Sequence, residues 1–176
     1  MNEHQSRPAG NRVNGLLAAL LCGLLLVPAF AFAGKAKTDF SGAWKLNEDK
    51  TEMGEGRFGP APKVVVKQEG NNLEVTRTRM GRDGQEMTNT AKLTLDGKEV
   101  TEEGENRSSK STAKWSDDGK KLMIHTTSSF TRDDQTFERK TEEVWEMSDG
   151  GKTLTIQSTT SSSRGERKTV AVYDKQ

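Results

Sequence analysis

The sequence has little of the chemistry on which most enzymes and metal proteins depend. Its 176 residues include one cysteine, one tyrosine and two histidines. With Cys22 alone the chain forms no internal disulfide, and His125 is the only histidine after His4. A nitrogen and sulfur metal site, or a Ser-His or Cys-His nucleophile, therefore has almost nothing to build on. We expect no enzymatic activity, no metal and no cofactor.

Long apolar runs are also missing, except for one near the amino terminus. Residues 16–27 form that run, which follows the basic residues Arg7 and Arg12 and precedes an Ala-Phe-Ala sequence at 31–33. This is the pattern of a secretory signal and its cleavage site. The run is too short to span a bilayer. We expect a cleaved signal peptide at residues 1–33 and export of the protein to the periplasm or the exterior.

The mature chain is balanced in charge and lean in apolar residues. Removing 33 of the 176 residues leaves 143, a length that fits one domain at 34–176. Two of the 27 basic and one of the 26 acidic residues leave with the signal, so 25 of each remain. This balance implies no bulk attraction to nucleic acid or to an anionic membrane. Only 35 of the 143 residues are apolar, which favours a hollow barrel over a solid core.

What the chain does contain is a series of short alternating runs, rich in Thr and Val. Gly, Asp and Asn interrupt these runs about every ten residues, as in strands joined by hairpins. The pattern predicts an all-β fold, a single up-and-down antiparallel β-barrel of eight to ten strands. The expected strands begin near Asp39, Lys63, Leu73, Gln85, Lys98, Arg107, Lys121, Thr136, Lys152 and Arg167.

The large apolar residues of each run gather at one of its ends, and that end alternates between successive runs. Alternate side chains of a strand face opposite sides of the sheet, so one parity in each run should face the interior. In an up-and-down barrel the apolar ends then coincide. We expect one end closed by Trp, Leu and Ile and the other lined by Ser, Thr and Arg. The predicted barrel-closing residues are Trp44, Trp115, Trp145, Leu122, Ile124, Leu154 and Ile156.

All nine arginines of the mature chain map to the polar half or to its connecting loops. The forked donors of arginine suit carboxylate or phosphate. Arg139 and Glu143 share the inward parity and are candidates for a buried pair. The alternative interpretation is that strand bulges turn the arginines outward as ordinary solubilising charge. The predicted ligand-binding residues are Arg79, Arg107, Arg132, Arg139, Arg164, Ser128, Thr141 and Thr160.

Both edges of the mature chain resemble known β-barrels. The run Phe40-Ser41-Gly42-Ala43-Trp44-Lys45-Leu46 resembles the amino-terminal signature of lipocalins and intracellular fatty-acid-binding proteins. The run Val172-Tyr173-Asp174-Lys175 is similar to the end of the latter group, and the whole resembles bacterial secreted lipocalin-like proteins. The resemblance implies a calycin barrel, a Trp44 plug at its closed end and a lid at residues 47–62. One departure is that Ala171 stands where fatty-acid-binding proteins carry their carboxylate-anchoring arginine.

These observations favour one function and leave a second one open. We expect an extracytoplasmic binding protein that takes a small polar or anionic ligand in the open half of a β-barrel. The alternative is a protein-interaction or inhibitor module of the cell envelope with no small-molecule ligand. The expected partners are thus a small molecule or an envelope protein, with no nucleic acid and no membrane span in the mature chain.

Overall fold

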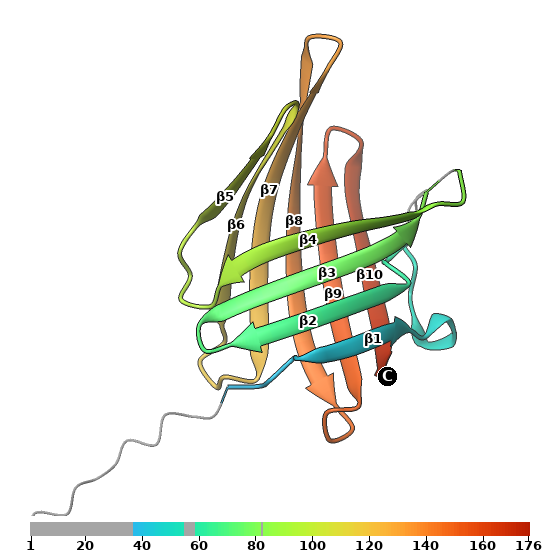
Figure 1. Cartoon of the computed structure of the whole chain (residues 1–176), viewed down its shortest axis with the longest axis vertical. Coiled ribbons are helices and arrows are strands. Elements are labelled where there is room, and N and C mark those ends of the chain that lie inside the picture. The colour runs from blue at the N-terminus through green and yellow to red at the C-terminus, as the bar shows by residue number, and fades with distance from the viewer. Residues whose placement is uncertain (1–36, 55–58, 82) are drawn as a thin grey trace, which may run out of the picture. The chain divides into compact units, whose positions relative to one another are not determined.

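A computed structural model describes residues 37–54, 59–81 and 83–176, so the predicted signal peptide lies outside the described residues. Within them the chain forms ten strands and one short 3-10 helix (Figure 1). No helix of this part is long and apolar enough to cross a membrane. The elements are β1 (Gly42–Leu46), η1 (Glu48–Lys50), β2 (Lys63–Glu69), β3 (Asn72–Met80), β4 (Glu86–Thr94), β5 (Val100–Gly104), β6 (Arg107–Trp115), β7 (Lys121–Arg132), β8 (Gln135–Ser148), β9 (Thr153–Ser162) and β10 (Gly165–Lys175).

All ten strands belong to one antiparallel sheet, in the order β4-β3-β2-β1-β10-β9-β8-β7-β6-β5. Because β1 pairs with both β2 and β10, the first and last strands lie side by side. The two edges, β4 and β5, share no ladder among the described residues. Across this seam the Lys92 amide donates to Glu102 Oε1 at 3.4 Å. The sheet is therefore a nearly closed up-and-down barrel, which confirms the predicted fold class.

The first strand begins at Gly42 and not near Asp39, because the preceding residues cover the closed end of the barrel. Asp39 Oδ1 accepts from the Ser41 amide at 2.9 Å, which forms a local turn in place of a ladder. The Thr38 amide donates to the Gly119 carbonyl at 3.2 Å, and the Phe40 amide donates to Gln68 Oε1 at 3.2 Å. This segment thus connects the β6–β7 turn to β2.

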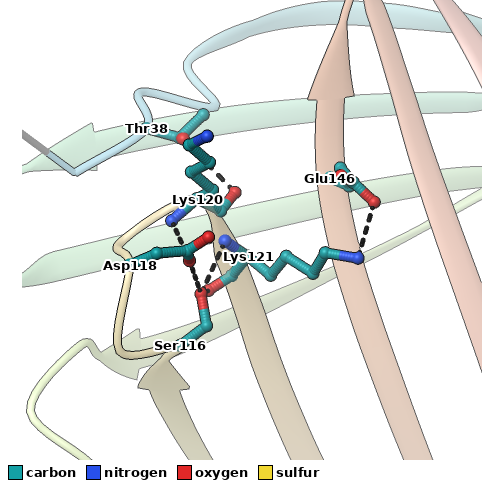
Figure 2. A network of polar contacts seen from close by, with 6 residues as sticks. All are labelled: Thr38, Ser116, Asp118, Lys120, Lys121 and Glu146. Atoms are coloured by element: carbon teal, nitrogen blue, oxygen red, sulfur yellow. Dashed lines mark hydrogen bonds and ion pairs between the residues drawn. The ribbon is translucent and has the colours of Figure 1, made fainter.

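Figure 2 shows how the β6–β7 turn is held beneath this segment. Asp118 Oδ1 accepts from Ser116 Oγ at 2.6 Å and from the Lys120 amide at 3.1 Å. Thr38 Oγ1 donates to the Lys120 carbonyl at 3.3 Å. Lys121 Nζ forms an ion pair with Glu146 Oε2 on the adjacent strand at 3.0 Å. The contacts fix the turn against both the amino-terminal segment and β8.

The closed end is filled by aromatic side chains that pack on Phe40. The ring of Phe40 stacks on Trp115 at 5.8 Å between centroids and meets Trp145 edge-on at 5.7 Å. Trp44 Nε1 donates to the Phe40 carbonyl at 3.0 Å, so the N–H group of this buried indole has a hydrogen-bond partner. Burial of each such side chain contributes about 2 kcal/mol or more. All seven residues predicted to close the barrel are buried, namely Trp44, Trp115, Leu122, Ile124, Trp145, Leu154 and Ile156.

Candidate functional site

The inward side chains of β7, β8, β9 and β10 change from apolar to polar, row by row, toward the open end. Each row is set by the register of the three ladders that join these strands. The lowest complete row is Leu122, Trp145, Ile156 and Ala171, and above it lie Ile124, Glu143, Ser158 and Thr169. The next row is Thr126, Thr141, Thr160 and Arg167, followed by Ser128, Arg139, Ser162 and Gly165.

A cavity of about 710 Å³ lies among the upper rows, between these strands and β3. Its hydroxyl side chains are Thr126, Thr141, Ser158, Thr160, Ser162 and Thr169. Its charged side chains are Arg77, Arg79, Arg139, Arg164, Arg167, Glu143 and Glu166. Five arginines against two glutamates give this lining a net charge of three positive. The remaining surface is supplied by Gly59, Pro60, Ala61, Ile156, Gly165, Ala171 and Tyr173.

Glu143 forms the polar floor of the cavity by accepting two hydrogen bonds at one oxygen. Its Oε2 accepts from Arg77 Nη2 at 2.7 Å and from Trp145 Nε1 at 2.9 Å. The guanidinium of Arg77 also lies over the Trp145 ring, 5.7 Å from its centroid. The Arg77 and Glu143 side chains are only 24% and 18% exposed, respectively. Charge-assisted hydrogen bonds of this kind are strong because little water competes for them.

The predicted pairing of Arg139 with Glu143 is wrong. The two residues are four apart on β8, which separates them by about 13 Å along an extended strand. The partner of Glu143 is Arg77, which comes from β3. In Figure 1, β3 runs across the face of the sheet formed by β8 and β9, and this crossing brings the two side chains together.

Arg79 and Arg139 are charged groups of the cavity with no ion-pair partner among the described residues. No described carboxylate lies within 4.0 Å of either guanidinium. Burial lowers the pKa of Arg79, and the positive charges of Arg77 and Arg139 lower it further. Glu143 and Tyr173 act in the opposite direction but do not cancel these effects. Since arginine nevertheless stays protonated, the cavity retains uncompensated positive charge.

Tyr173 adds an uncharged polar group at the base of the cavity. The residue is 2% exposed and pairs with Leu154 in the β9–β10 ladder. Burial raises the pKa of Tyr173 to about 12, so its phenol is protonated at neutral pH. The group is therefore a neutral hydrogen-bond donor, and it does not offset the charge of the arginines.

Five of the eight predicted ligand-binding residues line the cavity, namely Arg79, Arg139, Thr141, Thr160 and Arg164. Ser128, Arg107 and Arg132 are not among its lining residues. For Arg107 and Arg132 the reason is that residues 135–138 of β8 pair with β7 alone, so the β7–β8 hairpin extends beyond β9. Arg132 lies at its tip with a side chain 80% exposed, 3.3 Å from Asp133. Two further arginines, Arg57 and Arg82, lie outside the described residues.

The sequence interpretation did not include Arg77, Arg167 or the segment 59–61 in the site. Arg77 has the inward parity, but parity does not show which strand faces it across the barrel. Arg167 pairs with Thr160 in the β9–β10 ladder, and its Nη2 donates to the Met53 carbonyl at 3.2 Å. Residues 59–61 belong to the predicted lid, and they contribute backbone and small side chains to the cavity.

His125, the one histidine among the described residues, is not part of the cavity lining. Among the described residues, no group of three His, Cys, Asp or Glu side chains could hold a metal ion. The side chain of His125 is 57% exposed, and its Nδ1 lies 3.6 Å from Glu142 Oε1. The imidazole therefore faces solvent on the outside of β7, as its parity predicts.

Comparison with known proteins gives one similar solved structure. It is the crystal structure of zebrafish ileal bile acid-binding protein complexed with cholic acid, with a TM-score of 0.49 and 21% sequence identity. The similarity covers 78% of this chain and 98% of that chain. No family model and no curated protein matches the sequence.

Proposed function

We propose that this protein is an extracytoplasmic binding protein that takes a small anionic ligand in the open half of its barrel. The observation that supports this proposal is the presence of Arg79 and Arg139 in the cavity without a described carboxylate partner. Both residues are solvent-exposed, and a cleft lined by charges of one sign attracts ligands of the opposite sign. A bound anion supplies a counter-charge, and the guanidinium forks match carboxylate or phosphate geometry.

The dimensions and lining of the cavity agree with a small-molecule site. Such sites have volumes of about 300–1,000 Å³ and combine apolar walls with a few polar groups that orient the ligand. The volume here is about 710 Å³, and Ile156, Ala171 and Tyr173 form apolar surface beneath the arginines. The extracytoplasmic part of the proposal is supported by the signal pattern at residues 1–33.

Native mass spectrometry of the protein purified from its own host tests this function. We expect a co-purifying small anion that is lost from the Arg79→Gln/Arg139→Gln double variant. Arg132→Gln is the matched control, because it removes the same charge from an exposed position outside the cavity. Retention of the adduct by the double variant, or its absence from a folded wild-type protein, would contradict the proposal.

A second function is favoured by the exposed apolar side chains near the open end. Phe130 stacks on Phe137 at 5.0 Å on the β7–β8 hairpin, and it is 40% exposed. Met80 and Met87, on the β3–β4 hairpin, are 63% and 64% exposed. Solvent-exposed apolar side chains of this size are typical of contacts with another protein.

This second candidate is a protein-interaction module of the cell envelope. In-cell cross-linking from position 130 should then yield one adduct of defined mass, lost from a Phe137→Ser/Met80→Ser variant whose cavity is intact. The small-molecule adduct of the first proposal should be unaffected by that variant. A wild-type protein that gives no cross-link excludes the interaction function.

A further inference from the structure

The cavity lining holds four arginines that have no ion-pair partner among the described residues, and this positive charge restricts the ligand. Arg77 is neutralised by Glu143 at 2.7 Å, which leaves Arg79 on β3, Arg139 on β8, and the pair Arg164 and Arg167 near the start of β10. Glu166, the other carboxylate of the lining, forms its ion pair with Lys168 at 3.3 Å. A ligand with one negative charge would leave at least three of these four guanidiniums uncompensated. A dianionic group compensates two of them and can bind Arg79 and Arg139 together.

The wall opposite β3 restricts the ligand further, because it is rich in hydroxyl groups. Six Ser and Thr side chains line it, and they come from four adjacent strands. Thr141 Oγ1 and Thr160 Oγ1 share one hydrogen bond at 3.3 Å, so each keeps further donor or acceptor capacity. An alkyl chain packed here would desolvate these hydroxyls without replacing their hydrogen bonds to water. Hydroxyl groups of a ligand can both donate to them and accept from them.

The two walls together define one ligand chemistry. We propose that the cavity binds a dianionic group carried on a polyhydroxylated molecule, as in a sugar phosphate. Arg79 and Arg139 hold the dianionic group toward the open end, with Arg139 one row above Thr141, and the hydroxyl wall of β7 to β10 holds the polyhydroxylated part. This inference rests on the proposed function, and it names the class of ligand for the same cavity.

A matched pair of probes tests the requirement for two charges. Glucose 6-phosphate and glucose 6-sulfate have the same shape, but at pH 7.5 only the phosphate is largely dianionic, because its second pKa is about 6. Isothermal titration calorimetry should show the phosphate binding about tenfold more tightly at pH 7.5, a difference of about 1.4 kcal/mol. At pH 5 the two affinities should converge, because the phosphate then carries one charge. The sulfate controls for any effect of pH on the protein itself.

Single variants test the two halves of the site separately. Arg79→Gln and Arg139→Gln should each abolish most of the preference for phosphate over sulfate, whereas Arg132→Gln should leave it unchanged. Thr160→Val should weaken the binding of glucose 6-phosphate severalfold but should hardly change the binding of inorganic phosphate. Thr159→Val is its control, because that neighbour has the opposite parity and is absent from the cavity lining.

The outcomes separate this inference from the proposed function. Equal affinity for the phosphate and the sulfate at pH 7.5 overturns the requirement for a dianion, while the anion-binding function stands. Octanoate that binds as tightly as glucose 6-phosphate overturns the requirement for hydroxyl groups, again with the anion-binding function intact. If neither the sugar anions nor octanoate bind to folded protein at millimolar concentration, both the inference and the proposed function are wrong.

Discussion

The Glu143→Gln variant should lower the stability of the protein and raise its affinity for anions. The substitution keeps the size of the side chain and an oxygen that can accept from Trp145 Nε1, now 2.9 Å from Glu143 Oε2. It removes the charge that neutralises Arg77 at 2.7 Å. The net charge of the cavity lining then rises from three positive to four, and Arg77 becomes free to contact a ligand.

The size of the stability effect follows from the exposure of the pair. A fully buried charge that loses its partner destabilises a protein by about 3–5 kcal/mol. The Arg77 and Glu143 side chains are 24% and 18% exposed, so water screens part of this loss. We expect a loss of about 1–3 kcal/mol in the free energy of unfolding, or roughly 3–9 °C in Tm for a domain of this size.

Urea denaturation measures the first effect, and calorimetric titration with glucose 6-phosphate measures the second. The control is Glu142→Gln, which removes the same charge from the next residue, whose side chain is 67% exposed and faces outward beside His125. Exposed pairs contribute about 0–1 kcal/mol, so the control should change neither quantity much. The reasoning would be refuted if both variants were equally stable, or if Glu143→Gln bound the anion more weakly than the wild type.

Three other substitutions test the remaining structure. Phe40→Ala should destabilise the barrel by about 3–5 kcal/mol in chemical denaturation, because it empties the space between Trp115 and Trp145; a loss below about 1 kcal/mol would contradict a packed closed end. Burial raises the pKa of Tyr173 to about 12 in the folded state, above its ordinary value of about 10, so this group stabilises the fold below pH 10. That stability should decline between pH 10 and pH 12 by about 1.4 kcal/mol per pH unit, and Tyr173→Phe should remove this part of the dependence. Since Tyr173 is the only tyrosine, ultraviolet absorbance of tyrosinate reports its titration directly, and a midpoint near pH 10 would contradict its burial. Asp134→Gly should raise the Tm and add about 0.5–1 kcal/mol to the free energy of unfolding. The reason is that Asp134 has a φ of 57° in the β7–β8 turn, a conformation that glycine adopts without strain. An unchanged Tm would argue against this turn geometry.

The strands and their turns could be predicted because both depend on local features. Alternation of apolar and polar residues identified the ten strands, and those at Lys63, Arg107 and Lys121 begin at the predicted residue. Turns such as the one at Asp133 and Asp134 follow from residues that tolerate positive φ. The apolar rows at the closed end follow from parity, because parity decides which face of a strand each side chain occupies.

Contacts between strands that are not neighbours were decided by the tertiary structure alone. Neither the composition nor the alternation indicates that β3 crosses β8. Because of this crossing, Glu143 forms its ion pair with Arg77 and not with Arg139. The same holds for how far a hairpin extends past its neighbours, which places Arg132 in solvent while Arg139 lines the cavity. A sequence determines on which face a side chain lies, because alternation is a property of a single strand. What that side chain meets depends on the twist and closure of the whole sheet.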